Sequence, residues 1–309
     1  IFITYSIVLA DATFQYFHGS NLLGYIYDIT QQPRLSGFFK DELKLGSYLA
    51  RLSPLIFLQL ELFRNQNKTY TSLKNTMFYI FIFFYTFAIF SSGERTSFFY
   101  YLLSLFLFFI SLCNLKKSFI IFLVCIIGIL FSYSGGKSRL IETTILQIDG
   151  AFKNSKAEKF KLKDFDKIPI QHLHHWKSTV LMAKENIFFG VGPRMFRVEC
   201  KNIKYKVPNG CATHPHSLYF QLLGEAGTIG VIFLFFLFFC ILKKLIASYE
   251  KNNFFLIENK KTLSFFSLSC LFLHFFPFLP NGNFFNNWLN IITFLPMGIF
   301  LYSNQKVKS

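Results

Sequence analysis

Residues 213–242 read THPHSLYFQLLGEAGTIGVIFLFFLFFCIL. The stretch opens with two histidines and continues as an apolar segment over residues 218–242, long enough for a helix that crosses a bilayer. His214 and His216 therefore lie where an extramembrane segment meets the membrane surface. A histidine side chain exchanges a proton near neutral pH, so this junction is a candidate site for proton transfer.

The composition indicates membrane spans along the whole chain. Of its 309 residues, 52% are hydrophobic and 45 are Phe. Apolar runs of spanning length recur between basic residues, which predicts an all-α polytopic membrane protein. We expect the end of a span at residues 1–10, a polar loop at 11–44, and further spans near 46–62, 75–92, 96–113, 118–134, 218–242, 262–280 and 285–302.

Three regions follow from this pattern. Residues 1–134 are expected to form transmembrane helices with short loops, residues 135–217 one large loop, and residues 218–309 the C-terminal helices. The chain begins with Ile1 inside an apolar run, so we expect a fragment that lacks its original N-terminus.

Basic residues give the chain an orientation. They lie in every second short loop between the predicted spans, and the positive-inside rule assigns these loops to the cytoplasm. These residues are Arg64, Lys68, Lys74, Lys116, Lys117, Lys243, Lys244, Lys251, Lys260, Lys261, Lys306 and Lys308. The large loop then faces outward, into the periplasm of a Gram-negative cell. All seven histidines map to that side, although the size of the loop alone accounts for five of them.

The net charge of +16 does not indicate a nucleic-acid partner. Much of the charge lies at helix ends, where membrane topology explains it. The chain carries no zinc-finger, RNA-binding or helix-turn-helix pattern. We expect membrane lipids, and not nucleic acid, as partners.

Two cysteines lie in the large loop. Cys200 and Cys211 have ten residues between them and come just before the histidines. In an oxidising periplasm they could form a disulfide that fixes the return of the loop to the membrane. The alternative is a pair of free thiols.

A helix that starts near Pro215 would carry two stripes. One stripe would hold His216, Phe220, Leu223, Gly227 and Gly230. The other would hold Ser217, Gln221, Glu225 and Thr228, and a polar stripe in a membrane helix must face protein or water. His216 would then stand at the outer end of a helix inside a bundle. The alternative is an interfacial histidine bonded to a backbone carbonyl.

Outward-side arginines are candidates for binding anions. Arg95 lies in SSGERTSFF, residues 91–99, at a short turn between two spans. Its planar guanidinium suits a diphosphate, but an ordinary arginine could equally contact lipid headgroups there. Arg34, Arg194 and Arg197 are further candidates. Arg51 lies about one turn inside a span, which is costly unless it is paired or faces water.

We expect no metal and no cofactor. Asp164 and Asp166 form a DxD pattern, but they lie in the lysine-rich run KFKLKDFDK, which is typical of a solvated loop. His172, His174 and His175 and the later HxH lack a further ligand at metal-binding spacing.

These residues resemble the O-antigen ligase and O-antigen polymerase family of bacterial envelope glycosyltransferases. His216-Ser217, nine residues, and Gly227-Thr228-Ile229-Gly230 match the ligase pattern of His, then Asn, Ser or Gln, nine residues, and GxxG. The segments SGERT at 92–96, ENIFFGVGPRMFRVEC at 185–200 and RLSGFF at 34–39 also resemble family motifs.

The resemblance implies a GT-C-type multispan bundle with a large periplasmic loop, in the bacterial inner membrane. Family members move a glycan from undecaprenyl diphosphate without metal or nucleotide sugar. Ligases use a lipid A-core acceptor, and polymerases use another lipid-linked repeat unit. His216 would be the catalytic histidine and Arg95 a diphosphate contact. Histidines stand where the second essential arginine of the family is expected, so Arg197 is the substitute.

We therefore expect a metal-independent, inverting glycosyltransferase with His216 as general base and Arg95 on the diphosphate. Arg197, Arg34, His214 and His175 are the expected substrate-binding residues. The same chemistry serves the polymerase alternative. A transporter of lipid-linked oligosaccharide is a third possibility, but it would favour charged groups near the bilayer midplane, and the polar groups here gather on one side.

Overall fold

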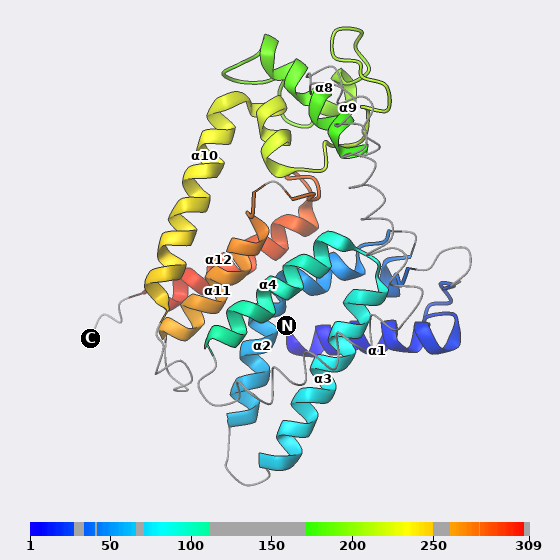
Figure 1. Cartoon of the computed structure of the whole chain (residues 1–309), viewed down its shortest axis with the longest axis vertical. Coiled ribbons are helices and arrows are strands. Elements are labelled where there is room, and N and C mark those ends of the chain that lie inside the picture. The colour runs from blue at the N-terminus through cyan, green and yellow to red at the C-terminus, as the bar shows by residue number, and fades with distance from the viewer. Residues whose placement is uncertain are drawn as a thin grey trace, which may run out of the picture. The chain divides into compact units, whose positions relative to one another are not determined.

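The computed structural model describes residues 1–27, 34–40, 42–65, 71–111, 171–249, 260–277 and 279–305. Within these ranges every named element is a helix, and no strand occurs. The described residues fall into two compact units (Figure 1). Unit 1 takes its residues from Ile1–Glu142, Lys244–His274 and Pro296–Ser309, and unit 2 from Thr143–Lys243 and Phe275–Leu295.

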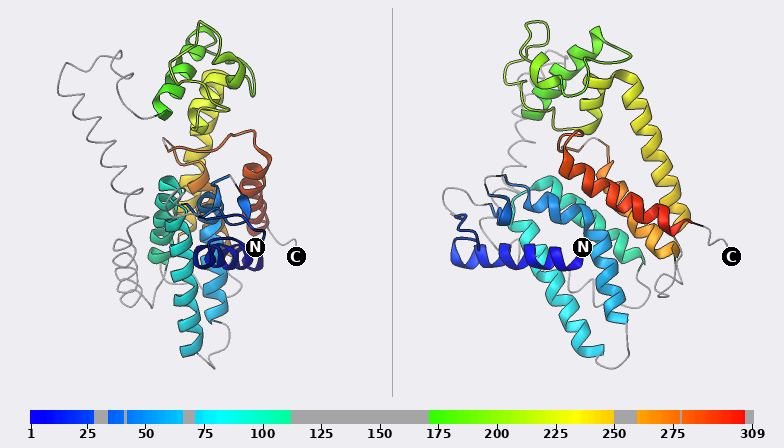
Figure 2. Two further views of the ribbon diagram at one scale, coloured as in Figure 1. Left: turned by 90° about the vertical axis from the view of Figure 1, so that its right-hand side faces the viewer. Right: turned by 180° about the vertical axis from the view of Figure 1, so that it is seen from behind.

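Unit 1 is built around one central helix, α2. Its helices are α1 (Phe2–His18), the 3₁₀ helix η1 (Gly37–Phe39), α2 (Leu45–Asn65), α3 (Thr71–Ser91), α4 (Arg95–Ser111) and α11 (Lys260–His274). Helix α2 contacts all the others in this set (Figure 2). The centre is aromatic, with Phe57 packed against Tyr85, Tyr101 and Phe108. The Tyr85 hydroxyl donates to the Leu49 carbonyl over 2.7 Å, which ties α3 to α2.

A buried charge inside unit 1 has partners. Arg51 of α2 is only 2% exposed, yet its guanidinium lies 2.9 Å from His274 Nδ1 of α11. Its Nε donates to Ser47 Oγ, and its guanidinium carbon lies 5.6 Å from the centre of the Tyr100 ring. The cost of placing an arginine inside an apolar helix is therefore met by pairing, one of the two arrangements expected from the sequence.

Unit 2 contains α8 (Gln171–Glu185), α9 (Phe196–Glu199), most of α10 (Leu218–Ser248) and the first part of α12 (Asn287–Ser303). Helix α10 bends at Gly227, whose φ of 70° and ψ of −165° are not helical (Figure 1). A Cβ atom at Gly227 would lie 2.2 Å from the Phe188 carbonyl oxygen. Glycine is therefore required there both by backbone conformation and by the close approach of the 187–189 loop.

The helices match the expected membrane class. Ser72–Ser91 and Leu218–Ser248 are long and apolar enough to cross a bilayer, and Arg95–Ser111 is a shorter apolar helix. The span expected at 118–134, and Asp164 and Asp166, lie outside the described residues. One expectation is wrong: α1 continues to His18, so the polar segment begins at Gly19 and not at residue 11. Helix formation continues because Asp11 is buried and accepts hydrogen bonds from Leu22 N and Asn21 Nδ2.

Candidate functional site

Four histidine rings gather in unit 2, two from α8 and two from the segment before α10. The centroid of the His216 ring lies 4.2 Å from that of His214, 5.1 Å from that of His172 and 5.4 Å from that of His175. His216 is thus the ring that contacts all the others. We call His172, His175, His214 and His216 the histidine cluster.

His216 is held by its backbone rather than by a helix. Its φ of 56° is left-handed, which is uncommon for a residue other than glycine. The Asn281 amide donates to the His216 carbonyl over 2.8 Å. Trp176 Nε1 donates to the Pro215 carbonyl over 3.0 Å, and the Trp176 ring stacks on Phe220 at 4.6 Å. These contacts fix the direction in which the imidazole points.

The helical face expected for His216 is therefore wrong. Helix α10 begins at Leu218 and not near Pro215, so His216 lies outside it. Gly227 breaks the helix, so neither it nor Gly230 shares a continuous face with His216. The stripe assumed 3.6 residues per turn, and the positive φ angles of His216 and Gly227 interrupt that helical period.

Burial keeps the imidazoles of His214 and His216 neutral. Burial is the main cause that lowers the pKa of His216 to about 3, and the neighbouring His214, His172 and His175 contribute to the same shift. Burial likewise lowers the pKa of His214 to about 4. Since a neutral imidazole has one nitrogen that accepts a proton, both side chains are in the form that a general base needs at neutral pH.

His175 in the cluster and Ser217 next to it each have a buried polar atom that is unpaired within the described residues. His175 Nδ1 and Ser217 Oγ have no hydrogen-bond partner within the described part of the chain. An unpaired buried polar atom costs free energy, and a substrate hydroxyl would remove that cost.

The described residues hold no group of three His, Cys, Asp or Glu side chains arranged to bind a metal ion.

A disulfide ties Arg197 to the histidine segment. Cys200 and Cys211 are bonded, with Cα atoms 5.2 Å apart. Arg197 lies three residues before this bridge and His214 three residues after it. The exposed Arg197 guanidinium is near enough for its charge to lower the pKa of His214. The structure therefore brings Arg197, His214, His216 and His175 together in one unit.

Gln221 and Glu225, two of the four residues of the expected polar stripe, lie on α10 and face protein. Gln221 and Glu225 are each 1% exposed. Glu225 accepts hydrogen bonds from the Phe196 amide and from Gln221 Nε2, both at 3.0 Å. Gln221 Nε2 also donates to Asn283 Oδ1 over 2.9 Å. Glu225 thus fixes the start of α9, the helix that carries Arg197.

The GVG segment, residues 190–192, packs against the first part of α10. The Val191 and Gly192 amides donate to the Gly224 and Glu225 carbonyls. A Cβ atom at Gly190 would lie 2.5 Å from the Gly224 oxygen. The segment caps the first part of α10 by close backbone contact, which two neighbouring glycines in a loop could have indicated.

Arg95 belongs to unit 1, at the first position of α4. Its side chain is exposed, and the first turn of α4 contains no acidic residue. The preceding residue, Glu94, accepts hydrogen bonds from the Gly46 and Ser47 amides over 2.9 and 3.0 Å. Glu94 therefore caps the start of α2 and holds the turn that presents Arg95. Burial raises the pKa of Glu94, and its hydrogen bonds oppose that shift.

Arg34 contacts the same turn. Its Nε donates to the Ser92 carbonyl over 2.9 Å and its guanidinium to the Leu43 carbonyl over 3.3 Å. These bonds give Arg34 a positioning role within unit 1. A contact between Arg34 and substrate stays a prediction.

Comparison with known families adds an independent finding. A family model described as O-Antigen ligase matches residues 80–236, just over half of the chain. The matched range contains Arg95, the disulfide and the histidine cluster, whereas Arg34 lies before it. No curated protein matches the chain.

Proposed function

Because this chain belongs to the O-antigen ligase family, we propose that it moves a glycan from undecaprenyl diphosphate to a lipid A-core acceptor. Membership of this family implies a ligase or polymerase type of activity in lipopolysaccharide biosynthesis. The apolar helices indicate a location in a membrane. The donor, the acceptor and the placement of the active site on the periplasmic face of the inner membrane are parts of the proposal.

His216 is the proposed general base. An acceptor hydroxyl oxygen attacks the anomeric carbon, and its proton passes to the neutral His216 imidazole. The bond between the anomeric carbon and the diphosphate breaks, and its electron pair leaves with undecaprenyl diphosphate. One displacement inverts the anomeric centre without metal. Assistance of this kind contributes about 10²–10⁴ in rate.

Arg95 and Arg197 are the proposed contacts of the diphosphate. Charge develops on the leaving group as the glycosidic bond breaks, and fixed guanidinium groups stabilise it. Arg95 stands at a helix N-terminus with no acidic residue in the first turn, a position that favours anions. His214, His175 and Arg34 are the proposed further substrate contacts.

The observation that carries this proposal is the position of His216 among three other histidines. With a pKa of about 3, the ring is a weak base in the substrate-free protein. A bound diphosphate would place negative charge near the cluster, and an opposite charge raises the pKa of a histidine. The base would therefore strengthen when donor is bound.

A deletion strain distinguishes this function from its nearest alternative. Loss of glycan attachment, with long lipid-linked chains retained, supports a ligase. Accumulation of single repeat units supports polymerisation by the same chemistry. Unchanged lipopolysaccharide in the deletion strain would contradict both.

A further inference from the structure

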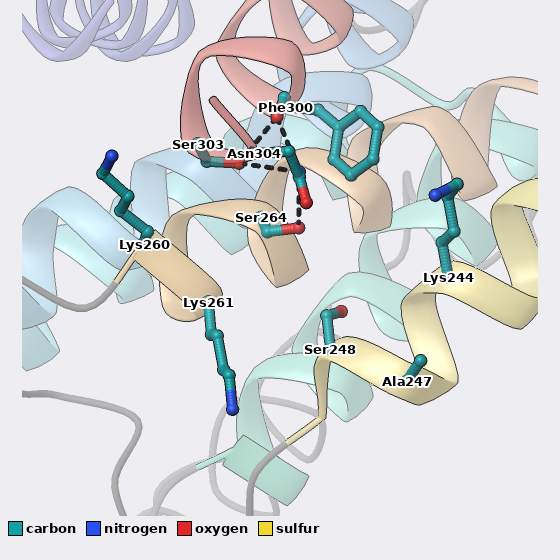
Figure 3. A pocket seen from close by; sticks show the side chains of 9 residues that line it. All are labelled: Lys244, Ala247, Ser248, Lys260, Lys261, Ser264, Phe300, Ser303 and Asn304. Carbon is teal, nitrogen blue, oxygen red and sulfur yellow. Dashed lines mark hydrogen bonds between the residues drawn. The ribbon is translucent and has the colours of Figure 1, made fainter. Parts of the chain in front are cut away.

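Unit 1 contains a cavity of about 260 Å³ at the ends of three helices (Figure 3). Lys244 lines it from α10, Lys260, Lys261 and Ser264 from α11, and Phe300 and Asn304 from the end of α12 and the residue after it. We call this site the lysine pocket. Its residues belong to unit 1, whereas the histidine cluster belongs to unit 2, and it has no part in the proposed reaction.

The lysine pocket is cationic. Its lining residues, all of them described in the structure, include three lysines and no Asp or Glu. Lys260 Nζ donates to the Gln305 carbonyl over 3.1 Å, and Lys244 Nζ lies 5.8 Å from the centre of the Phe300 ring. Both partners are uncharged, so these two contacts do not neutralise the positive charge of Lys244 or Lys260.

The floor of the pocket offers further polar groups. Ser264 is 6% exposed, and its hydroxyl accepts a hydrogen bond from Asn304 Nδ2 over 3.5 Å. Figure 3 shows Ser264 and Asn304 between the lysines, with the Phe300 ring beside them. Phosphate oxygens accept hydrogen bonds from ammonium, hydroxyl and amide groups alike. The Phe300 ring adds an apolar wall, which suits the non-phosphate part of a larger ligand.

The length of α10 places the pocket at headgroup level. The residues from Thr228 to Ser248 follow the bend at Gly227, and at 1.5 Å per residue they span roughly 31 Å. This is close to the hydrocarbon thickness of a bilayer, about 30 Å. Lys244 therefore lies near the end of the apolar segment. The exposed apolar side chains of Ile246, Leu301 and Tyr302 lie beside the lining residues in sequence.

We propose that the lysine pocket binds the phosphate group of an anionic phospholipid. Basic pockets between transmembrane helices are typical sites for such headgroups. Free phosphate carries the same chemistry, but the apolar wall and the position at headgroup level favour the lipid. The affinity depends on charge, so salt weakens it.

Purified full-length protein in a neutral detergent allows a direct test with short-chain lipids. We expect dioctanoyl phosphatidylglycerol to bind at least tenfold more tightly than dioctanoyl phosphatidylcholine or inorganic phosphate. Lys244→Gln should weaken phosphatidylglycerol binding about fivefold, the effect of about one lysine at a membrane surface. Lys244→Gln/Lys260→Gln should weaken it at least tenfold. Lys243→Gln is the matched control, because Lys243 is exposed on α10 and does not line the pocket.

Several results would overturn the proposal. Equal binding of phosphatidylcholine would remove the role of charge, and equally tight binding of inorganic phosphate would make the ligand a free anion. A Lys243→Gln effect as large as that of Lys244→Gln would assign the effect to overall charge. Lys244→Arg keeps the charge and should keep the affinity, which guards against misfolding of the glutamine variants. Loss of binding in a folded Lys244→Arg protein would also contradict the site.

Discussion

The imidazole rings of His214 and His216 lie 4.2 Å apart with their planes inclined at 47°. A proton on either ring would place positive charge directly against the other, which is unfavourable for both. Burial acts in the same direction and lowers the pKa of each. The pair is therefore uncharged at neutral pH, and His216 can accept a proton from a substrate.

The pH dependence of transfer follows from this burial. Since the pKa of His216 is lowered to about 3, the base stays neutral as the pH falls from 8 through 6.5, the usual pKa of histidine. We expect kcat/KM, which reports the free enzyme, to stay constant to about pH 5 and to fall only below it. Steady-state transfer from a purified donor measures this. An acid limb centred near pH 6.5 would contradict the buried state of His216.

Arg95→Lys is expected to lower transfer at least tenfold. The charge remains, but the two parallel hydrogen bonds of a guanidinium to a diphosphate are lost. The matched control is Arg194→Lys, in which lysine can still donate to the Phe285 carbonyl that Arg194 contacts. Initial rates per unit of folded protein give the comparison. Near-normal transfer by the Arg95 variant would reduce that residue to an interfacial anchor.

Removal of the disulfide should loosen the histidine segment. Cys200→Ser/Cys211→Ser opens a loop with a sequence separation of 11, for which chain entropy predicts a loss of about 3 kcal/mol. We expect a lower unfolding temperature and slower transfer, because Arg197 and His214 flank the bridge. Cys240→Ser is the control, since Cys240 is a free cysteine. An unchanged unfolding temperature in the double variant would show that the bridge does not support the fold.

Gly227→Ala should reduce the yield of folded protein. The new Cβ atom would meet the Phe188 carbonyl at 2.2 Å, and the φ of 70° is strained for alanine. Gly298→Ala is the matched control, because no atom lies within 4 Å of its Cβ position in α12. That change should be neutral or stabilising by up to about 1 kcal/mol. Size-exclusion profiles and unfolding temperatures in detergent compare the two. Equal behaviour would contradict the bend at Gly227.

The apolar segments could be predicted from sequence because the bilayer fixes their length and composition. The segment expected at 218–242 begins at the first residue of α10, and those at 75–92 and 96–113 correspond to α3 and α4. The end of α1 could not be predicted in this way. The charged Asp11 suggested a loop, and its hydrogen bonds with Asn21 and Leu22, which allow it to lie buried in a helix, depend on tertiary structure.

The site was less predictable, because periodicity assumes a continuous helix. The left-handed φ of His216 and the bend at Gly227 remove the stripe that the sequence suggested. The approach of His172 and His175 to His216 joins residues about forty positions apart, and no local pattern indicates it. The hydrogen bonds from Trp176 to the Pro215 carbonyl and from Asn281 to the His216 carbonyl also join residues far apart in sequence, so no local pattern predicts them.

The most direct test of the central claim is the rate of glycan transfer by His216→Ala in proteoliposomes, per unit of folded protein. The account predicts a loss of roughly 10²–10⁴, the contribution of a general base. His214→Ala removes a neighbouring ring from the same segment and should cost less. A His216→Ala protein that is folded and retains more than about a tenth of the wild-type rate would contradict the assignment of His216 as the base.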